Sequence, residues 1–203
     1  SAAWLPSPGF SASRRRARHR RHPAHWPDDR AGHPLIVAEG RAAAMSGPCR
    51  ILDLRDSPWV DGPGRTILDT AAAIDPQRYV ITIGTFVAGD PGEHRYLQEA
   101  LRRGLATHAI VERRALDLEV LRQIERWCRE QGVRMLHTHD FRSDLYGLIA
   151  AHRLGIPAVA TCHGWIANNL KGHMYVRIDK RLLRRFDRVI VVSERMRGQL
   201  RAA

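Results

Sequence analysis

The chain has 203 residues, a formal net charge of +12 and a hydrophobic content of 44%. This length suits one large domain, or one domain with a tail, and the apolar fraction is ordinary for a globular core. Among these residues, no apolar stretch approaches the ~20 residues of a membrane-spanning helix. Cys49, Cys128 and Cys162 are odd in number and lack the Cys-x-x-Cys spacing, which predicts reduced thiols in a cytosolic compartment.

Residues 1–44 differ in composition from the rest of the chain. They are rich in Arg, His, Pro, Gly and Ala and show neither strand nor helix periodicity, so we expect a disordered basic tail. Met45 directly precedes Ser-Gly-Pro-Cys-Arg and then the first apolar run, and the tail could therefore be translated upstream sequence. Arginine is used heavily, whereas Lys171 and Lys180 are the only lysines. This bias indicates a GC-rich coding sequence rather than a nucleic-acid-binding surface, and we expect no nucleic-acid partner.

From residue 45 onward, strand-like and helix-like segments alternate. The expected strands are short apolar or β-branched runs at residues 51–54, 79–86, 107–111, 133–136, 156–160 and 189–192. The expected helices lie between them, at residues 66–74, 93–103, 117–132, 143–154 and 176–186, and a further helix begins at residue 196. Strands separated by helices favour right-handed crossovers. The predicted fold class is therefore α/β, with a doubly wound parallel sheet of Rossmann-like type.

Four of the expected strands lead into a polar or glycine-rich cluster. The clusters are Gly62-Pro63-Gly64, His137-Thr138-His139-Asp140, Thr161-Cys162-His163-Gly164-Trp165 and Ser193-Glu194. In a parallel sheet the carboxyl ends of all strands meet at one edge, which is where open α/β sheets bind their ligands. The order of the segments thus predicts one composite site, built from residues that are far apart in the sequence.

The first cluster matches neither of the common phosphate-binding motifs. Counted from Gly62, the third glycine of a dinucleotide fingerprint would fall at Ile67, and no Gly-Lys-Ser/Thr follows. What remains is a small-residue loop before a helix, whose amides could face an anion or a sugar. A simple tight turn explains Gly62 and Gly64 equally well.

The second cluster places His137 and His139 on the same side of a strand, a spacing that metal sites use. A metal-dependent hydrolase that uses these two residues is therefore one hypothesis, although no third ligand stands out. We interpret His137 instead as a core histidine, and His139 and Asp140, at the end of the strand, as ligand contacts. Arg142 could bind a phosphate or pair with Asp140.

The third cluster gives the sharpest single indication of a site. His163 is followed directly by Gly164, and a glycine at this place lets the backbone turn and lets a ligand approach closely. The alternative is a structural histidine with Trp165 packed over it. Because loop residues on rigid scaffolds often carry chemistry, we favour a functional role for His163.

With these clusters in this order, residues 50–203 resemble the N-terminal domain of GT-B glycosyltransferases, especially the retaining enzymes of family 4. The resemblance rests on the small-residue loop after the first strand and on the run Val-Arg-Met-Leu-His-Thr-His at residues 133–139. It also rests on the passages from Gly-Ile-Pro to Thr-Cys-His-Gly at 155–164 and from Phe-Asp-Arg to Val-Ile-Val-Val-Ser at 186–193. It implies two Rossmann-like domains facing across a cleft, of which the N-terminal one mainly holds the acceptor and the C-terminal one mainly binds the nucleotide-sugar.

The resemblance also implies roles for particular residues. Gly62 and Gly64 match a loop that approaches the donor sugar and its phosphate, although Pro63 separates glycines that many relatives have adjacent. His163 matches the histidine that contacts the transferring sugar, and it is the candidate catalytic residue. Gly164, next to it, is a candidate for substrate binding.

By the same resemblance, His139 and Asp140 would line the acceptor side, and Ser193 and Glu194 lie where the last strand opens toward the cleft. Arg142 remains a candidate phosphate contact. The expected reaction moves a sugar from an NDP-sugar to a polysaccharide or glycolipid acceptor, with retention of configuration and with no metal or other cofactor.

The sequence ends before a second domain, and the Glu-x7-Glu pair of that domain in the family has no counterpart here. A departing diphosphate then lacks most of the groups that stabilise it. We therefore predict that this chain alone binds nucleotide-sugar weakly and turns over little or nothing. A non-catalytic sugar-binding half that pairs with a separate chain is the alternative.

A basic run late in the sequence bears on the location of the protein. Its members are Lys171, Arg177, Lys180, Arg181, Arg184, Arg185 and Arg188. Such a run is commonly a solvated helix face, but it could also rest on anionic lipid near a lipid-linked acceptor, each charge contributing ~1 kcal/mol. We expect a cytoplasmic protein, with peripheral contact to the inner face of the membrane as a further hypothesis.

Overall fold

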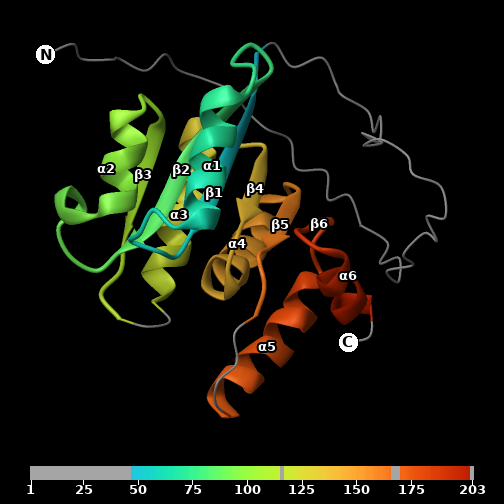
Figure 1. Ribbon diagram of the computed structural model, residues 1–203. Helices are drawn as coiled ribbons and strands as arrows, with labels where there is room; N and C mark the ends of the chain where they lie inside the picture. Colours follow the sequence, from blue (N-terminus) through green and yellow to red (C-terminus); the bar gives the residue numbers. More distant parts are fainter. Residues whose placement is uncertain (1–46, 115–116, 166–169, 202–203) are drawn as a thin grey trace, which may run out of the picture. The chain divides into compact units, whose positions relative to one another are not determined.

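The computed structural model describes residues 47–114, 117–165 and 170–201, except for the side chains of residues 170, 171 and 173 (Figure 1). The basic tail predicted at residues 1–44 lies outside this described part. Within it, six strands form one parallel sheet in the order β3-β2-β1-β4-β5-β6. The expected strands are all present, and the predicted doubly wound α/β fold is confirmed.

The bounds of the elements agree with the prediction to within a few residues at most places. The strands are β1 (Cys49–Arg55), β2 (Tyr79–Val87), β3 (Ala106–Val111), β4 (Met135–Thr138), β5 (Ala158–Cys162) and β6 (Arg188–Val191). The helices are α1 (Gly62–Ala73), α2 (Arg95–Arg102), α3 (Leu118–Gln131), α4 (Phe141–Leu154), α5 (Leu170–Leu183) and α6 (Glu194–Arg201), with a short 3-10 helix η1 at Pro91–Glu93.

β4 and β5 each begin two residues later than expected. The apolar runs do start at Val133 and Ile156, but the backbone N–H of each still donates to the preceding helix, to Cys128 of α3 and to Ala151 of α4. The turns that close these helices therefore take up the first residues of each run. The strands end later as well, so that β4 includes Thr138 and β5 ends at Cys162.

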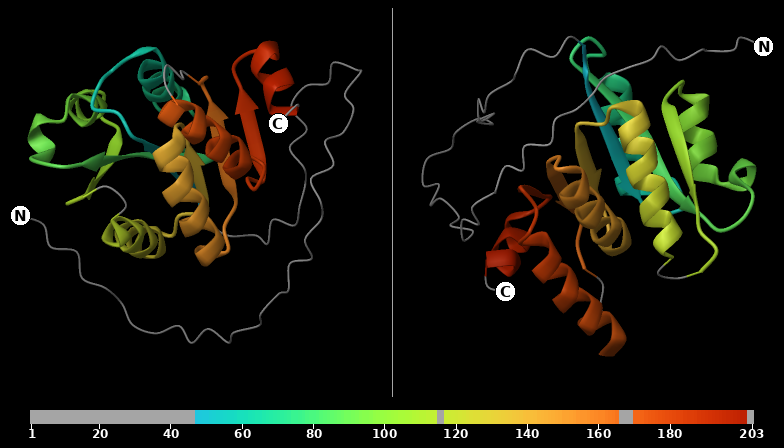
Figure 2. Two further views of the ribbon diagram at one scale, coloured as in Figure 1. Left: turned by 90° about the horizontal axis from the view of Figure 1, so that it is seen from below. Right: turned by 180° about the vertical axis from the view of Figure 1, so that it is seen from behind.

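Helices cover both faces of the sheet, with α1 and α2 on one side and α3 and α4 on the other (Figure 2). A smaller apolar cluster, which includes Leu68 and Ile83, joins the first pair of helices to the sheet. A larger cluster, which includes Ile124 and Leu136, lies on the other side. The central strands are therefore buried between two helical layers, whereas β6, at one edge of the sheet, remains partly exposed.

Helix α1 begins at Gly62, four residues earlier than predicted. The side chain of Asp61 accepts a hydrogen bond from the backbone N–H of Gly64 at 2.9 Å. Pro63 occupies a position in the first turn, where the missing N–H of proline costs no helical hydrogen bond. Gly62-Pro63-Gly64 is therefore the first turn of a helix, and its prediction as a loop before the helix is wrong.

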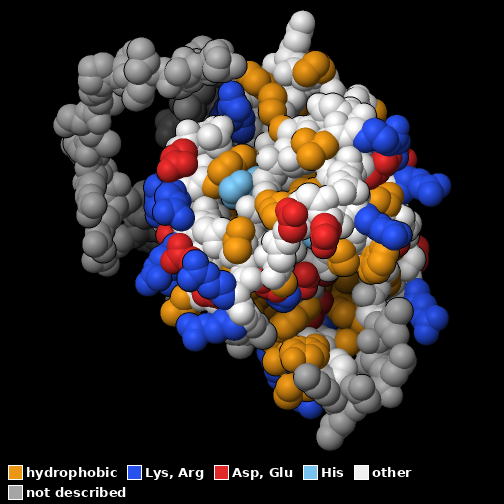
Figure 3. Space-filling view, turned by 90° about the vertical axis from the view of Figure 1, so that its left-hand side faces the viewer, with side chains coloured by type: hydrophobic (Ala, Val, Ile, Leu, Met, Phe, Trp, Pro, Cys, Tyr) orange, Lys and Arg blue, Asp and Glu red, His pale blue; other side chains and the backbone are white. Residues whose placement is uncertain are grey.

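The surface of the domain carries charges of both signs. On the face that carries α2 and β3, acidic side chains lie among basic ones (Figure 3). Helix α5 extends beyond the carboxyl-terminal edge of the sheet (Figure 1). Among the described helices, none has both the length and the apolar character that crossing a bilayer requires.

Candidate functional site

β1 and β4 lie side by side in the middle of the sheet, and the sheet grows outward from them in opposite directions. β2 and β3 continue it beyond β1, whereas β5 and β6 continue it beyond β4. The loops after the two central strands therefore turn away from each other. In open α/β sheets this switch point, at the carboxyl edge, is where ligands bind.

Four ionisable side chains, which we call the histidine cluster, meet at this edge. Asp53 of β1 and His137 of β4 are direct neighbours in the sheet, and Oδ2 of Asp53 lies 3.0 Å from Nδ1 of His137. Oδ1 of Asp53 lies 2.8 Å from Nε2 of His139. Nδ1 of His139 lies 3.1 Å from Nε2 of His163, which follows β5. On its other side, His137 contacts Oγ1 of Thr161 at 2.8 Å.

The cluster holds an anion inside the domain. Burial would by itself raise the pKa of the Asp53 carboxyl, but the positive charge of His139 and the polar contacts with His137 and His139 hold that pKa well below its usual range. The contact with His139 lacks the alignment of a hydrogen bond. Burial, together with the charges of His139 and Arg55, lowers the pKa of His163, which is therefore neutral at pH 7.

The cluster also bears on the hypothesis of a metal-dependent hydrolase. Asp53, His137 and His139 each offer one ligand atom, and these atoms lie within 4.8 Å of one another. However, the carboxylate oxygens of Asp53 lie 2.8 and 3.0 Å from the two ring nitrogens, whereas two ligands of a tetrahedral zinc ion stand about 3.3 Å apart. The distances are those of direct carboxylate–imidazole contacts, and we interpret the cluster in that way.

A second set of polar side chains, Arg55 and Asp61, lies beneath the first turn of α1. Nη2 of Arg55 is 2.6 Å from both carboxylate oxygens of Asp61, which caps the helix. Nη1 of Arg55 is buried and has no hydrogen-bond partner among the described residues. A side chain at position 64 would overlap this nitrogen, so Gly64 is needed for the close approach. The arrangement places a fixed positive charge beside the N-terminus of a helix, where anions are favoured.

The loop after β5 combines a half-buried histidine with a sharp turn. His163 contacts His139, and Gly164 follows with a φ of 129°, a conformation that residues with a side chain rarely adopt. Trp165 is held by α5, because its Nε1 donates to Oδ2 of Asp179 at 2.7 Å. The glycine after His163 is thus explained by the geometry of the turn.

Asp140 and Arg142 are both engaged by other residues of the domain. Asp140 caps α4: its Oδ1 accepts from the backbone of Ser143 at 3.0 Å, and its Oδ2 accepts from the backbone of Asp56 at 2.6 Å. It therefore ties the loop after β4 to the loop after β1. Arg142 pairs with Glu112 and lies 3.4 Å from Asp56. The expected pair between Arg142 and Asp140 is wrong.

Ser193 and Glu194 lie at the same edge but after β6, the outermost strand on that side. Oγ of Ser193 accepts from the backbone of Met196 at 3.3 Å, and Glu194 pairs with Arg197 at 2.5 Å. The structure therefore brings His139 and His163 together, whereas it gives Ser193 and Glu194 partners on α6.

Sequence reasoning missed three residues of the site, Asp53, Arg55 and Asp61. The first two alternate with leucines in the run Ile-Leu-Asp-Leu-Arg, a pattern that marks one polar side of a strand and could have identified them. Asp61 directly precedes Gly-Pro-Gly, and an aspartate just before a first-turn proline is a common helix start.

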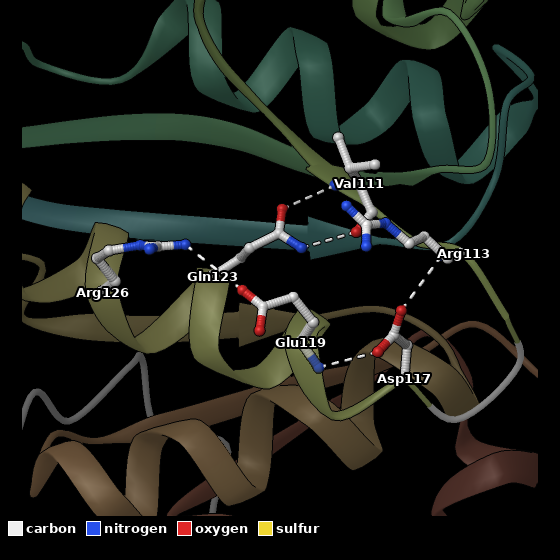
Figure 4. Close-up of a pocket in the computed structure, with 6 residues that line it drawn as sticks. All are labelled: Val111, Arg113, Asp117, Glu119, Gln123 and Arg126. Carbon is white, nitrogen blue, oxygen red and sulfur yellow. Dashed lines mark hydrogen bonds and ion pairs between the residues drawn. The ribbon is translucent and has the colours of Figure 1, made fainter.

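A hollow of about 270 Å³ lies elsewhere, between β3 and the start of α3 (Figure 4). Four of its polar side chains, those of Asp117, Glu119, Gln123 and Arg126, are engaged with each other or with the backbone. Gln123 bonds both the N–H and the C=O of Val111, Asp117 caps α3, and Arg126 pairs with Glu119. We therefore interpret this hollow as part of the structure that closes the edge of the sheet.

Comparison with known proteins identifies the family. The sequence model of the glycosyl transferase 4-like domain matches residues 61–203. The chain belongs to this family. The expected resemblance to the N-terminal domain of the GT-B glycosyltransferases is thus confirmed, both for the fold and for the family. No curated protein matched the sequence of this chain.

Solved structures share the fold of the glycosyl transferase 4-like domain. Anabaena HepE in complex with UDP and glucose is 16% identical, with a TM-score of 0.61, over 76% of this chain and 41% of that one. The lipopolysaccharide outer core galactosyltransferase WaaB is 13% identical, with a TM-score of 0.54, over 75% and 42%. A UDP-N-acetylglucosamine 2-epimerase is 9% identical, with a TM-score of 0.52, over 76% and 45%. The chain thus spans less than half the length of each.

Proposed function

We propose that this domain is the acceptor-side half of a retaining glycosyltransferase, which moves a sugar from an NDP-sugar to a polysaccharide or glycolipid acceptor. The observation that carries the proposal is the contact between His139 and His163 at the carboxyl edge, in a chain of the glycosyl transferase 4-like family. The pair offers hydrogen-bonding groups for sugar hydroxyls. Arg55 and the N-terminus of α1 offer positive charge for a diphosphate.

The proposed substrate class is supported by the proteins that share the fold. HepE was solved with UDP and glucose and with UDP-glucose, and the epimerase is named for a UDP-sugar. Transferases and epimerases share this class of substrate but differ in reaction. The family match therefore decides the reaction that we propose, and the structural neighbours support only the nucleotide-sugar.

Within this proposal, His163 is the catalytic residue that contacts the transferring sugar. It is half-buried and neutral, so it acts through hydrogen bonds rather than through charge. Gly164 and Gly64 let ligand and backbone approach each other. Asp140 and Arg142 act indirectly, because their protein partners fix the loops at the edge. Transfer proceeds without a metal ion, since the positive charge near the diphosphate comes from the protein.

The chain supplies about two fifths of the length of HepE. We place the groups that stabilise the leaving diphosphate mainly in the other part of such an enzyme, so the 203-residue chain should bind UDP-sugars and GDP-sugars weakly and release little sugar. Binding can be measured by saturation-transfer NMR with UDP-glucose, comparing His163→Ala with His152→Ala. His152 is exposed near the end of α4 that lies away from the site, so its loss should change nothing.

Weaker binding by His163→Ala alone would support the assignment of the site. No detectable binding of any UDP- or GDP-sugar by the wild-type chain would contradict the proposed substrate class. Free sugar above the buffer blank would contradict the prediction that this chain turns over little alone.

Helix α5 supports a further part of the proposal, peripheral contact with the inner face of an anionic membrane. Met174 and Ile178 are large, exposed apolar side chains, and the exposed Arg177 and Arg181 lie on the same helix. The side chain of Lys171, another member of the predicted basic run, lies outside the described part. Sedimentation with vesicles should require anionic lipid, and equal binding to neutral vesicles would contradict this contact.

A further inference from the structure

Trp59 lies in the loop between β1 and α1, at the carboxyl edge of the sheet, and 57% of its surface is exposed. Among the described residues, the other two tryptophans are half-buried against protein groups: Trp127 stacks on His108, and Trp165 donates to Asp179. A single exposed apolar side chain needs no explanation by itself. The case for Trp59 therefore depends on how its ring is held and on what lies around it.

The indole of Trp59 is held in place although it is exposed. The guanidinium of Arg95, at the start of α2, lies over it, 5.0 Å from the centre of the ring. Next to Trp59, the C=O of Pro58 accepts a hydrogen bond from the backbone N–H of Tyr96 at 3.1 Å. The N–H of Trp59 itself donates to Oγ of Ser57 at 3.3 Å. The loop and the start of α2 thus hold the ring at the surface before a ligand arrives.

Arg95 brings hydrogen-bond donors to the same place. Its side chain is exposed, and among the described residues no carboxylate pairs with it. A guanidinium has five N–H donors, and because the contact with Trp59 is not a hydrogen bond, these donors are open to a ligand or to water. Asp90 and Glu93, in the turn before α2, are exposed as well. Their negative charges offset that of Arg95, which favours a neutral ligand with oxygen acceptors over a strongly anionic one.

Trp59 is also connected to the candidate site. Two residues after it, Asp61 pairs with Arg55, and the charges of both act on the pKa of His163. Two residues of extended chain span only about 7 Å. Helices α1 and α2, which follow and contact this loop, pack on β2 and β3, whereas His163 follows β5. Trp59 and His163 therefore lie toward different arms of the sheet, and a ligand that reaches both crosses the switch point.

We propose that Trp59 and Arg95 form a binding site for a neutral sugar ring of the acceptor saccharide. A pyranose ring has a face of C–H groups, which packs on the apolar face of an indole, and a rim of hydroxyl oxygens, which accept from a guanidinium. The ring bound here is a different part of the substrate from the sugar that His163 contacts. Its role as acceptor rests on the proposed function, whereas the binding of a saccharide at Trp59 does not.

The indole N–H signal of Trp59 in ¹H–¹⁵N spectra of the 203-residue chain tests this binding directly, and Trp59→Phe assigns the signal by its disappearance. The probes are the neutral disaccharides cellobiose, maltose, lactose and diacetylchitobiose. We expect at least one of them to shift the Trp59 signal saturably. This measurement on the wild-type chain holds even if a variant fails to fold.

Saturation-transfer NMR with the same disaccharide then compares the variants. Trp59→Ala should weaken binding roughly tenfold, the effect of losing one well-placed aromatic contact, and Arg95→Gln should weaken it several-fold, as the loss of one hydrogen bond does. Leu101→Ala is the matched control, because Leu101 is 60% exposed near the other end of α2. Its loss should change nothing.

Three results would overturn the proposal. The first is no saturable shift of the Trp59 signal with any of the four disaccharides, and the second is equal binding by the wild type and Trp59→Ala. The third is a larger shift of this signal with UDP or with inorganic phosphate than with the disaccharides, because the site would then bind a nucleobase or an anion.

His163→Ala separates this site from the proposed function. It should weaken binding of UDP-glucose and leave disaccharide binding at Trp59 unchanged. If the chain binds no UDP-sugar or GDP-sugar, the proposed function fails, while the saccharide site stands or falls by the signal of Trp59 alone.

Discussion

Asp53 lies between two fully buried leucines of β1, Leu52 and Leu54. Side chains alternate along a strand, so the leucines face the core beneath α3 and α4 while Asp53 faces the other way. A carboxylate inside a domain is tolerated when it is paired, and here His137 and His139 pair it. This one residue links the stability of the domain to the state of its candidate site.

The lowered pKa of Asp53 predicts a loss of stability in acid. Because the folded protein holds this carboxyl more acidic than the unfolded chain does, its contribution is complete above about pH 4 and is lost as the pH falls further. The contribution should be about 2 kcal/mol, the size typical of a paired carboxylate. Urea unfolding between pH 5 and pH 3 should show a smaller decrease for Asp53→Asn than for the wild type. Equal decreases would show that Asp53 is not the paired anion described here.

Gly64 and Gly62 form a matched pair for testing the contact beneath α1. A side chain at Gly64 would overlap Nη1 of Arg55, whereas one at Gly62 would meet open space. Gly64→Ala should therefore displace Arg55 from Asp61 and lower the free energy of unfolding by about 1–3 kcal/mol, as overpacking generally does. Gly62→Ala should be close to neutral. Similar losses for both variants in urea unfolding would mean that the overlap with Arg55 does not govern this turn.

At the scale of elements, helix caps join the loops at the carboxyl edge. Asp140 begins α4 with a capping box that includes Ser143, and it also accepts from the backbone of Asp56 in the loop after β1. Because these two loops flank the switch point, one carboxylate sets both the start of a helix and the spacing of the site.

Two substitutions of Asp140 separate these functions. Asp140→Ser keeps one oxygen for the cap but removes the link to Asp56, and Asp140→Ala removes both. The free energy of unfolding should be about 1 kcal/mol lower for the alanine variant than for the serine variant, which is the usual contribution of an N-cap. Both should weaken UDP-glucose binding if the spacing of the loops matters. Equal stability of the two variants would contradict the role of the cap.

The strands were predictable because short apolar runs bounded by glycine and polar residues identify buried parallel strands directly. The parallel order then placed His139 and His163 at one edge, and the structure puts them in contact. The partners of Asp140 and Arg142 were not predictable, since pairs such as Arg142 and Glu112 depend on how separate loops pack. The partners of Asp53 were not predictable either, because the alternation in Ile-Leu-Asp-Leu-Arg indicates a polar side of β1 but not which side chains of β4 lie against it.

At the scale of the whole domain, the parallel strand order brings together the residues of the candidate site. The order β3-β2-β1-β4-β5-β6 places the ends of β1, β4 and β5 next to each other. Residues separated by 84 positions, such as Asp53 and His137, thereby become neighbours in the sheet. The same arrangement recurs in HepE and WaaB despite identities of 16% and 13%.

The central claim is that the histidine cluster and the first turn of α1 together face a nucleotide-sugar. Titration of the ¹⁵N-labelled chain with UDP-glucose, followed through backbone amide signals, tests it most directly. We predict saturable shifts at Gly64, His163 and Gly164, and none at Gln123 in the hollow beside β3. Shifts confined to the region of Gln123, or no saturable shifts at the carboxyl edge, would contradict the account.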